Sequence, residues 1–301
     1  MAKLNVLVSL ITSDNDYQMA QASAAAEAAQ RLDTDIQVVY AANDAVNQTQ
    51  QLVKFIQSPL HRPDAIIVEP VGTAMPQIAA AAVAAGIGWG LVNRRGDYVV
   101  KLRENNRAPV FSISTDQEEV GRIQGKQFAT FLSEGGSVLY IEGPSTSEVV
   151  QLRRSGMNST KPRNVDLKVL RGDWTEASGY KAVKAWLALS TSRDLHIRLI
   201  GCQNDAMAIG ARKAFEEVPE SQTRNEWLSL PITGCDGTSK TGQEWVRRGL
   251  LAATIIMPPT AGQALEIMTT AIRSGGVQPP PHIVSQPSSY PALDKITARA
   301  S

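Results

Sequence analysis

The chain has few residues of the kinds that build metal sites and disulfide frameworks. Its 301 residues include only two cysteines, Cys202 and Cys235, and three histidines, His61, His196 and His282. The cysteines form no C-x-x-C motif and the histidines are far apart in sequence, so we expect no zinc site with the usual ligand spacing. We predict no metal and no cofactor, and we favour buried free thiols over a disulfide between the two cysteines.

An excess of charge of one sign is also lacking. Lys and Arg number 30 against 29 Asp and Glu, and the densest basic spots, Arg94-Arg95 and Arg247-Arg248, are isolated pairs. Surfaces that bind nucleic acid or anionic membranes usually carry a basic patch, so we expect neither partner. No apolar run approaches the length of a membrane span. The first apolar run, residues 6–11, is too short for a signal sequence, and no cleavage site follows it.

Motifs of the common enzyme classes are absent. The sequence contains no G-x-S-x-G, H-E-x-x-H or G-x-x-x-x-G-K-[ST] pattern. Thr12-Ser13-Asp14-Asn15 stands where a dinucleotide-binding chain has its glycine-rich turn after the first strand. His61 and His196 lie beside the starts of predicted strands, which is the wrong end of a sheet for catalysis. We therefore expect a binding protein rather than an enzyme.

Short apolar runs alternate with helical segments along the whole chain. The predicted strands cover residues 4–11, 36–40, 65–68, 87–92, 110–113, 137–141, 167–170, 197–201, 230–234, 252–256 and 282–285. The predicted helices cover residues 16–32, 45–57, 74–85, 118–132, 148–158, 176–189, 206–217, 239–248 and 261–273. Strands separated by helices of this size indicate parallel βαβ units. Two such arrays in tandem predict an α/β fold with two doubly wound parallel-sheet lobes.

Polar and aromatic residues follow several predicted strands, where open α/β sheets bind their ligands. They are Asn15, Tyr17, Asn93, Arg94, Trp174, Asn204 and Asp236. Amides, carboxylates and a guanidinium hydrogen-bond to hydroxyls, and aromatic rings pack against the C–H face of a sugar. The set is therefore typical of a site for a neutral polyol.

Each of these positions also has a structural interpretation. For Asn15 and Asn204, capping of the following helix is an equally good explanation, and for Asp116 and Asp205 capping is favoured. Trp174 lies in the polar stretch Gly172-Asp173-Trp174-Thr175-Glu176, which favours a functional role. The other tryptophans are expected to be packing residues: Trp89, Trp186, Trp227 and Trp245.

Three stretches carry a resemblance to a known family. They are Gln203-Asn204-Asp205-Ala206-Met207-Ala208-Ile209-Gly210-Ala211, Gly234-Cys235-Asp236-Gly237-Thr238 and Gly249-Leu250-Leu251-Ala252-Ala253-Thr254-Ile255. In order and spacing the whole chain resembles type I periplasmic binding proteins of the ribose-binding branch. That family also supplies the effector domains of lactose-repressor-type regulators.

The resemblance implies a fold of two lobes joined by a three-crossing hinge, with the ligand cleft between them. The expected lobes are residues 1–112 with 257–280, and 113–256 with 281–301. The crossings are expected near residues 112–114, 254–257 and 279–282.

The resemblance also implies a site. Asn15 and Tyr17 resemble the first-loop contacts, Trp174 the second stacking aromatic, and Asn204 with Asp236 the hydrogen-bonding pair of the far lobe. Arg94 matches the family's arginine, whereas Asn93 replaces the acidic residue that precedes it. Three further positions depart from the family pattern: Gln18 replaces a common aromatic, Gln151 stands near a usual arginine, and Met257 replaces a polar hinge residue.

The implied function is capture of a monosaccharide or similar polyhydroxylated molecule by hinge closure, for uptake through an ABC-type permease or for sensing. The alternatives are an effector-sensing domain of a transcription regulator and the sensor domain of a membrane-bound receptor. The family implies a periplasmic or extracytoplasmic location. A cytoplasmic location stays open, because no signal sequence is evident.

Overall fold

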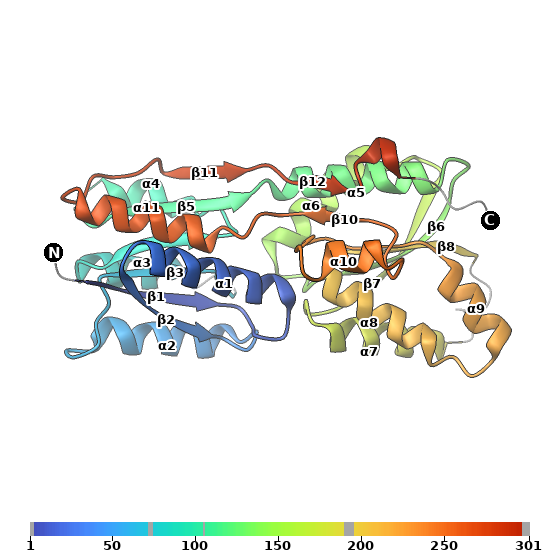
Figure 1. The fold of residues 1–301 in the computed structure, drawn as a ribbon, viewed down its shortest axis with the longest axis horizontal. Coiled ribbons are helices and arrows are strands. Elements are labelled where there is room, and N and C mark those ends of the chain that lie inside the picture. Colours follow the sequence, from blue (N-terminus) through green and yellow to red (C-terminus); the bar gives the residue numbers. More distant parts are fainter. Residues whose placement is uncertain (1–2, 72–74, 105, 190–195, 297–301) are drawn as a thin grey trace. The chain divides into compact units, whose positions relative to one another are not determined.

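The structure is a computed structural model that describes residues 3–71, 75–104, 106–189 and 196–296 (Figure 1). The chain divides into two compact units. Unit 1 comprises Met1–Thr115 and Pro259–Ser285, and unit 2 comprises Asp116–Pro258 and Gln286–Ser301. The chain therefore crosses between the units three times.

Unit 1 is built on one parallel sheet. Its elements in chain order are β1 (Leu4–Leu10), α1 (Asp16–Arg31), β2 (Thr34–Tyr40), α2 (Ala45–Gln57), β3 (Ala65–Val68), α3 (Met75–Ala84), β4 (Gly88–Val92), α4 (Tyr98–Arg103), β5 (Val110–Thr115), α11 (Ala261–Arg273) and β11 (His282–Ser285). The six strands lie in the order β11-β5-β4-β3-β1-β2, and each neighbouring pair is parallel. The chain reverses its winding direction at β1, so the sheet is doubly wound.

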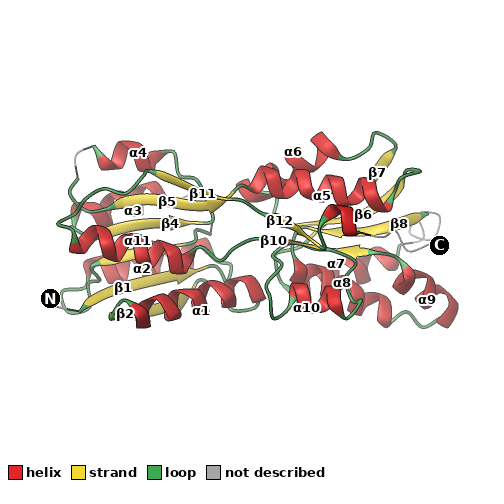
Figure 2. Ribbon diagram, turned by 45° about the horizontal axis from the view of Figure 1, so that its top comes forward, coloured by secondary structure: helices red, strands yellow, loops and turns green. Residues whose placement is uncertain are grey.

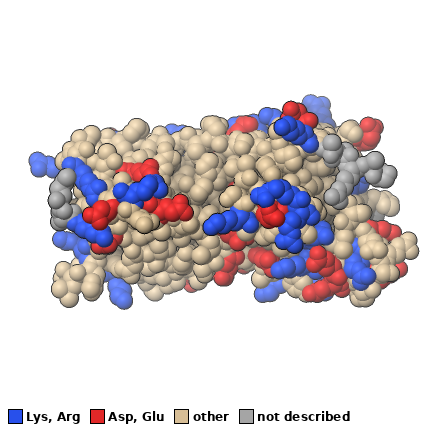
Figure 3. Space-filling view, in the orientation of Figure 1, with Lys and Arg blue, Asp and Glu red and all other residues tan. Residues whose placement is uncertain are grey.

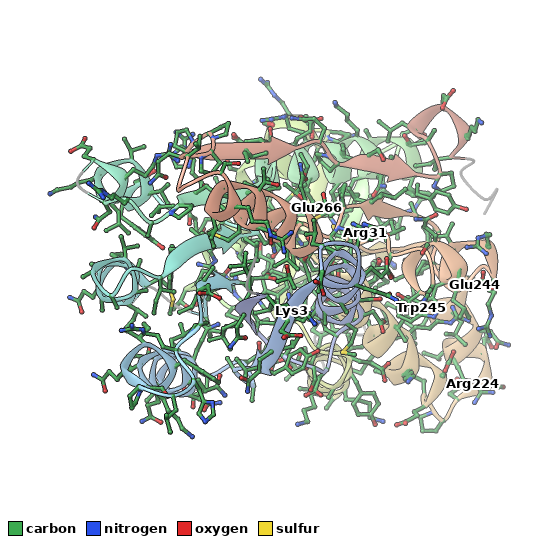
Figure 4. The ribbon with its side chains drawn as sticks, turned by 60° about the vertical axis from the view of Figure 1, so that its left-hand side comes forward. Lys3, Arg31, Arg224, Glu244, Trp245 and Glu266 are labelled. Atoms are coloured by element: carbon green, nitrogen blue, oxygen red, sulfur yellow. The ribbon has the colours of Figure 1, made fainter. Side chains whose placement is uncertain are left out.

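Helices cover both faces of this sheet (Figure 2). Residues of β1 alternate between two buried clusters: Val6 and Val8 pack with α1 and α11, whereas Leu7 packs with α2 and α3. This alternation follows from the two-residue period of a strand. An ion pair between Arg31 and Glu266, both labelled in Figure 4, joins α1 to α11 on the first face.

Unit 2 has a parallel sheet of four strands and a separate two-stranded antiparallel ribbon. Its elements are α5 (Gln117–Phe131), β6 (Gly136–Glu142), α6 (Glu148–Thr160), β7 (Val165–Arg171), α7 (Glu176–Leu187), β8 (Ile197–Cys202), α8 (Asp205–Glu216), α9 (Ser221–Ser229), β9 (Ile232–Thr233), α10 (Gly242–Arg247), β10 (Thr254–Ile256), β12 (Ser288–Tyr290) and the 3₁₀ turn η2 (Leu293–Lys295). The sheet order is β7-β6-β8-β9, and β10 pairs with β12. Here the winding reverses at β6.

The faces of this sheet are also covered separately. Leu139 and Ile141 of β6 pack in a cluster with α7 and α8, while Val138 and Tyr140 pack with α5 and α6.

The expected packing tryptophans are confirmed. Trp89 is fully buried in unit 1, Trp186 and Trp227 stand edge to face at 5.4 Å in unit 2, and Trp245 packs against the cluster of α7 and α8.

The last strand corrects the expected lobe boundaries. Residues 281–301 were assigned to the C-terminal lobe, but β11 pairs with β5 in the sheet of unit 1. The third crossing consequently lies after Ser285 rather than at residues 279–282, and the other two follow Thr115 and Pro258. Residues 297–301 of the expected lobe and Ala74, the expected start of a helix, lie outside the described residues.

Four elements were not expected from the sequence: α4, α9, β12 and the 3₁₀ turn η2. Helix α9 has no buried residue, so it lacks the apolar periodicity that marks a helix. Helix α4 has six residues and β12 has three, lengths at which such periodicity is weak. None of the described helices combines the length and the apolar character needed to cross a bilayer.

Candidate ligand-binding site

The first-loop residues of unit 1 lie beside the point where the sheet reverses its winding, between β1 and β3. Doubly wound sheets bind ligands at such a point, outside the carboxyl ends of the strands. Asn15 caps α1, because its Oδ1 accepts a hydrogen bond from the Gln18 N–H at 3.0 Å. Tyr17 lies in the first turn of this helix and is 3% exposed. The capping explanation for Asn15 is therefore confirmed.

A buried carboxylate, Glu69, follows β3 at the same point. Its Oε2 accepts from Gln18 Nε2 at 2.9 Å and its Oε1 accepts from Asn93 Nδ2 at 2.8 Å. The sequence interpretation missed this residue. A signal was present, because Glu69 directly follows the four aliphatic residues of β3 and so stands at the end of a buried strand.

Asn93 and Arg94 follow β4, as expected. Asn93 has a φ of 57° and its N–H donates to the Ile113 carbonyl at 2.8 Å. The left-handed region is uncommon for residues other than glycine, although asparagine tolerates it better than most. Arg94 is half-buried beside it. The structure thus places one amide, one guanidinium and the Glu69 carboxylate at neighbouring strand ends.

Trp174 is held at the end of β7 in unit 2 by several contacts. Its φ is 72°, and its carbonyl accepts from Asn204 Nδ2 at 2.8 Å. Asn204 also caps α8, because its Oδ1 accepts from the Met207 N–H at 2.9 Å. The ring lies so close to Gly143 that a Cβ there would be 2.2 Å from Cζ2 of Trp174. Gly143 follows β6, where the winding of this sheet reverses.

Arg153 is the second functional candidate that the sequence interpretation missed. It lies on the buried face of α6 with Val149, Gly156 and Met157, and is 3% exposed. An arginine on the apolar face of an amphipathic helix is the signal that could have identified it.

Arg153 contacts several neighbours within unit 2. Nε donates to Gln117 Oε1 at 2.9 Å, Nη1 donates to the Gln203 carbonyl, and Nη2 lies 3.1 Å from Met257 Sδ. All three acceptors are uncharged. The guanidinium carbon stands 5.7 Å from the centre of the Trp174 ring, a distance typical of a cation–π contact.

Gln151, the residue of α6 that the sequence predicted for the site, does not share the buried position of Arg153. Its side chain is exposed, and its Nε2 donates to the Ser145 carbonyl at 3.0 Å. Gln151 and Arg153 are separated by about 200° around a helix, so one faces solvent and the other the core.

Asp236 follows β9 in a conformation that is rare for its residue type. Its φ is 115°, its N–H donates to the Ile255 carbonyl at 3.0 Å, and its carbonyl accepts from the Met257 N–H at 3.1 Å. Strained backbone of this kind costs about 1–3 kcal/mol and persists where neighbours hold it. Here the hydrogen bonds to Ile255 of β10 and to Met257, the residue after β10, fix the backbone of Asp236. The Met257 side chain in turn contacts Arg153.

The neighbouring acids have structural roles. Asp205 was expected to cap α8, but Asn204 is the cap, and the Asp205 carboxylate instead accepts from the Gly237 N–H at 2.8 Å and from Thr254 Oγ1 at 2.7 Å. This expectation was wrong. Asp116 does cap α5 through the Glu119 N–H at 2.9 Å, as expected.

Both cysteines are free and buried in unit 2. Burial raises the pKa of the Cys202 thiol well above its ordinary value, and it raises the pKa of Cys235 as well. Such thiols stay protonated and unreactive at neutral pH. Within the described residues, no cluster of three His, Cys, Asp or Glu side chains could hold a metal ion.

On the face drawn in Figure 3, acidic and basic side chains are interspersed.

Two doubly wound α/β units with amides, carboxylates and arginines at their strand ends are typical of two-domain binding proteins. Residues 6–276 match the family described as periplasmic binding protein domain. The chain therefore belongs to this family, whose members are binding proteins rather than enzymes.

Curated relatives are similar over part of the chain. The D-allose-binding periplasmic protein of Escherichia coli (strain K12) is 26% identical over 174 residues, which are 56% of this chain and 52% of that protein. The xylitol-binding protein of Mycolicibacterium smegmatis is 25% identical over 202 residues, 65% of this chain and 51% of the relative. The chain thus spans about half the length of the curated relatives it matches.

A solved structure shows the same fold over nearly the whole chain. It is an ABC transporter periplasmic solute-binding protein from Actinobacillus succinogenes 130z with bound D-allose. It superposes with a TM-score of 0.77 at 23% identity and covers 95% of this chain and 97% of its own.

Proposed function

We propose that this protein binds a small uncharged polyhydroxylated molecule, a monosaccharide or sugar alcohol, without changing it covalently. The observation that carries the proposal is the placement of backbone strain. Asn93, Trp174 and Asp236 are three of the six residues other than glycine with a positive φ in the described part of the chain, and all three follow strands. Such strain concentrates at functional sites. Membership of the binding-protein family supports the same function.

The charges at the strand ends favour a neutral ligand. Arg94 and Arg153 are matched in number by the carboxylates Glu69 and Asp236. Amide and carboxylate oxygens accept hydrogen bonds from ligand hydroxyls, and the guanidinium groups donate them. The proposed ligand-binding residues are Asn15, Tyr17, Asn93, Arg94, Trp174, Asn204, Asp236 and Met257. On α6 we propose Arg153 as the ligand-binding residue in place of Gln151.

Hinge closure is the proposed means of capture. The ligand binds to strand-end residues of one unit, and rotation about the three crossings then adds the residues of the other unit and excludes water. Exclusion of water strengthens each polar contact and penalises each unpaired group, so affinity depends on a complete set of hydrogen bonds.

A thermal-shift screen tests the proposed function. The panel consists of D-allose, xylitol, pentoses, other hexoses and nucleosides. A ligand present at about 100 times its Kd stabilises the folded protein by about 2.7 kcal/mol, which raises Tm by several degrees. At least one neutral sugar or sugar alcohol is expected to do so. No shift with any member of the panel would contradict the proposal.

We propose that the bound molecule is handed to an ABC-type permease in an extracytoplasmic compartment. The family and the relatives named above support this role. Deletion of the gene is expected to reduce cellular uptake of the panel member that binds most tightly, and cell fractionation is expected to recover the protein outside the cytoplasm. Unchanged uptake would favour the sensing role instead.

A further inference from the structure

Unit 2 has a large cavity at the amino ends of its strands. Its volume is about 940 Å³, and residues of α7, α8 and α9 line it together with Ile197, the first residue of β8. Asn204, one of the residues proposed to bind the sugar, follows the other end of β8. A strand of six residues is about 20 Å long, so the cavity is separate from the strand-end residues.

One face of α9 is turned toward this cavity. Thr223, Glu226 and Trp227 line it, and their spacing places them on the same side of the helix. No residue of α9 is buried. A surface helix of a globular protein normally buries one face. The lining face of α9 is therefore left partly uncovered by the rest of unit 2.

Aromatic and aliphatic side chains form an apolar wall. Trp227 stacks on Phe215 of α8, with ring centres 5.1 Å apart, and Trp186 of α7 meets it edge to face. Leu187 and Leu230 also line the cavity. Small-molecule sites are typically cavities of about 300–1,000 Å³ with a mainly apolar lining and a few polar groups. This cavity has the size and the apolar part of such a site.

The ionised side chains around the cavity have an excess of negative charge. Among the described lining residues, Glu217, Glu220 and Glu226 stand against the single cation Lys184. Lys184 Nζ lies 3.0 Å from Glu217 Oε2, so these two charges offset one another. Arg224, the one cation of α9, adds a single positive charge. These five side chains therefore leave one negative charge unmatched, which favours a singly charged cation.

We propose that this cavity binds a small organic cation that has an apolar body, such as an arylalkylammonium ion. Glu220 and Glu226 provide the carboxylates for its ammonium group, and Trp227 provides an apolar surface for its ring. An indole also attracts a cation through the face of its ring. The inference goes beyond the proposed sugar-binding function and does not depend on it, because the two sets of residues lie at opposite ends of β8.

Calorimetric titration with three probes of similar shape tests the charge preference. The probes are phenethylamine, which is a cation at neutral pH, phenethyl alcohol, which is neutral, and phenylacetate, which is an anion. We expect phenethylamine to bind at least about tenfold more tightly than the alcohol, and phenylacetate to bind more weakly still. Equal binding of the amine and the alcohol, tighter binding of phenylacetate, or no saturable heat from the amine at millimolar concentration would overturn the inference.

Variants of the two exposed glutamates test whether the amine lies in the cavity. E220Q/E226Q removes both carboxylate charges with little change in side-chain shape, and its Kd for phenethylamine is expected to rise about tenfold. E244Q is the matched control, because Glu244 lies on α10 and pairs with Arg247. It should leave this Kd unchanged. Equal Kd values of E220Q/E226Q and the unmodified protein would assign the amine to another site.

A titration in saturating sugar separates this inference from the proposed function. The Kd for phenethylamine should be the same with and without the sugar that gives the largest thermal shift. Loss of the amine's heat in the presence of that sugar would place the amine among the strand-end residues and overturn the inference. If no sugar or sugar alcohol binds, the proposed function fails, and the three probes and the glutamate variants still test the cavity.

Discussion

The guanidinium carbon of Arg153 lies 5.7 Å from the centre of the Trp174 ring. The arginine is fixed by Gln117 and Gln203, and the backbone of the tryptophan is fixed by Asn204. A cation at this distance from an indole contributes about 0.5–2 kcal/mol, depending on its desolvation. Hydrogen bonds therefore hold both members of the pair within unit 2.

Loss of the indole or of the strained aspartate should weaken sugar binding. Trp174→Ala removes the apolar wall, and Asp236→Ala removes an acceptor on a held backbone, so each is expected to raise Kd tenfold or more, about 1.4 kcal/mol upward. Calorimetry with the best member of the panel measures this. Asp166→Asn, at an exposed position on β7, is the control. Unchanged affinity in both alanine variants would dispose of the site assignment.

Removal of the Arg153 charge should be as damaging. Arg153→Met keeps an unbranched apolar side chain at this buried position of α6 but removes the charge and the donors, so we expect Kd to rise about tenfold or more. Arg163→Met changes an exposed arginine just before β7 and should have no effect. Equal affinities of the two variants, again by calorimetry, would remove Arg153 from the site.

Gly143 is predicted to act through Trp174. An alanine Cβ would lie 2.2–2.5 Å from three ring atoms, so the ring must move. Overpacking of this kind typically costs about 1–3 kcal/mol of stability, and we expect a weaker Kd as well. In a double-mutant cycle Gly143→Ala should cost little when Trp174 is already alanine. Additive effects on Kd would show that the two residues act independently.

The predictable part of the fold followed from periodicity and strand length. The bounds of α2, β3, α11 and β11 are those that the sequence indicated, because each has a clear apolar pattern or a clear break at its ends. Periodicity and strand length did not predict to which of the two units β11 belongs. Strand pairing depends on contacts distant in sequence, here with β5.

The candidate site was predictable where residues directly follow strands. Asn93, Trp174 and Asp236 were all found by this rule, and their positive φ angles came only with the structure. Arg153 and Glu69 were missed for different reasons. Arg153 reaches its partners from within a helix, and Glu69 hydrogen-bonds to side chains of other elements, so neither relationship is visible without knowledge of the packing.

The stability of unit 1 should depend on the ionisation of His282. Burial lowers the pKa of this residue below its ordinary 6.5, an effect that Arg95 and Arg103 reinforce and Asp97 opposes. Its Nδ1 lies 2.7 Å from Ser112 Oγ on β5. Because the unfolded chain binds the proton more readily, stability is full above about pH 6.5 and falls as the pH drops through the lower folded pKa.

Denaturant unfolding at several pH values tests this dependence. We expect the free energy of unfolding of the unmodified protein to decrease as the pH falls below about 6.5, and to decrease less in His282→Asn. His61→Asn, at an exposed position, should retain the full decrease. The same pH dependence in all three proteins would contradict the role of His282.

The central claim is that the strand-end residues bind an uncharged, hydroxyl-rich molecule. Its most direct test is one calorimetric comparison of a neutral sugar with the corresponding sugar acid, using the sugar that gives the largest thermal shift. We expect the neutral sugar to bind at least about tenfold more tightly, because Arg94 and Arg153 are equalled in number by the carboxylates Glu69 and Asp236, so the set carries no net charge. Tighter binding of the acid, or no heat from any neutral sugar or sugar alcohol, would contradict the account.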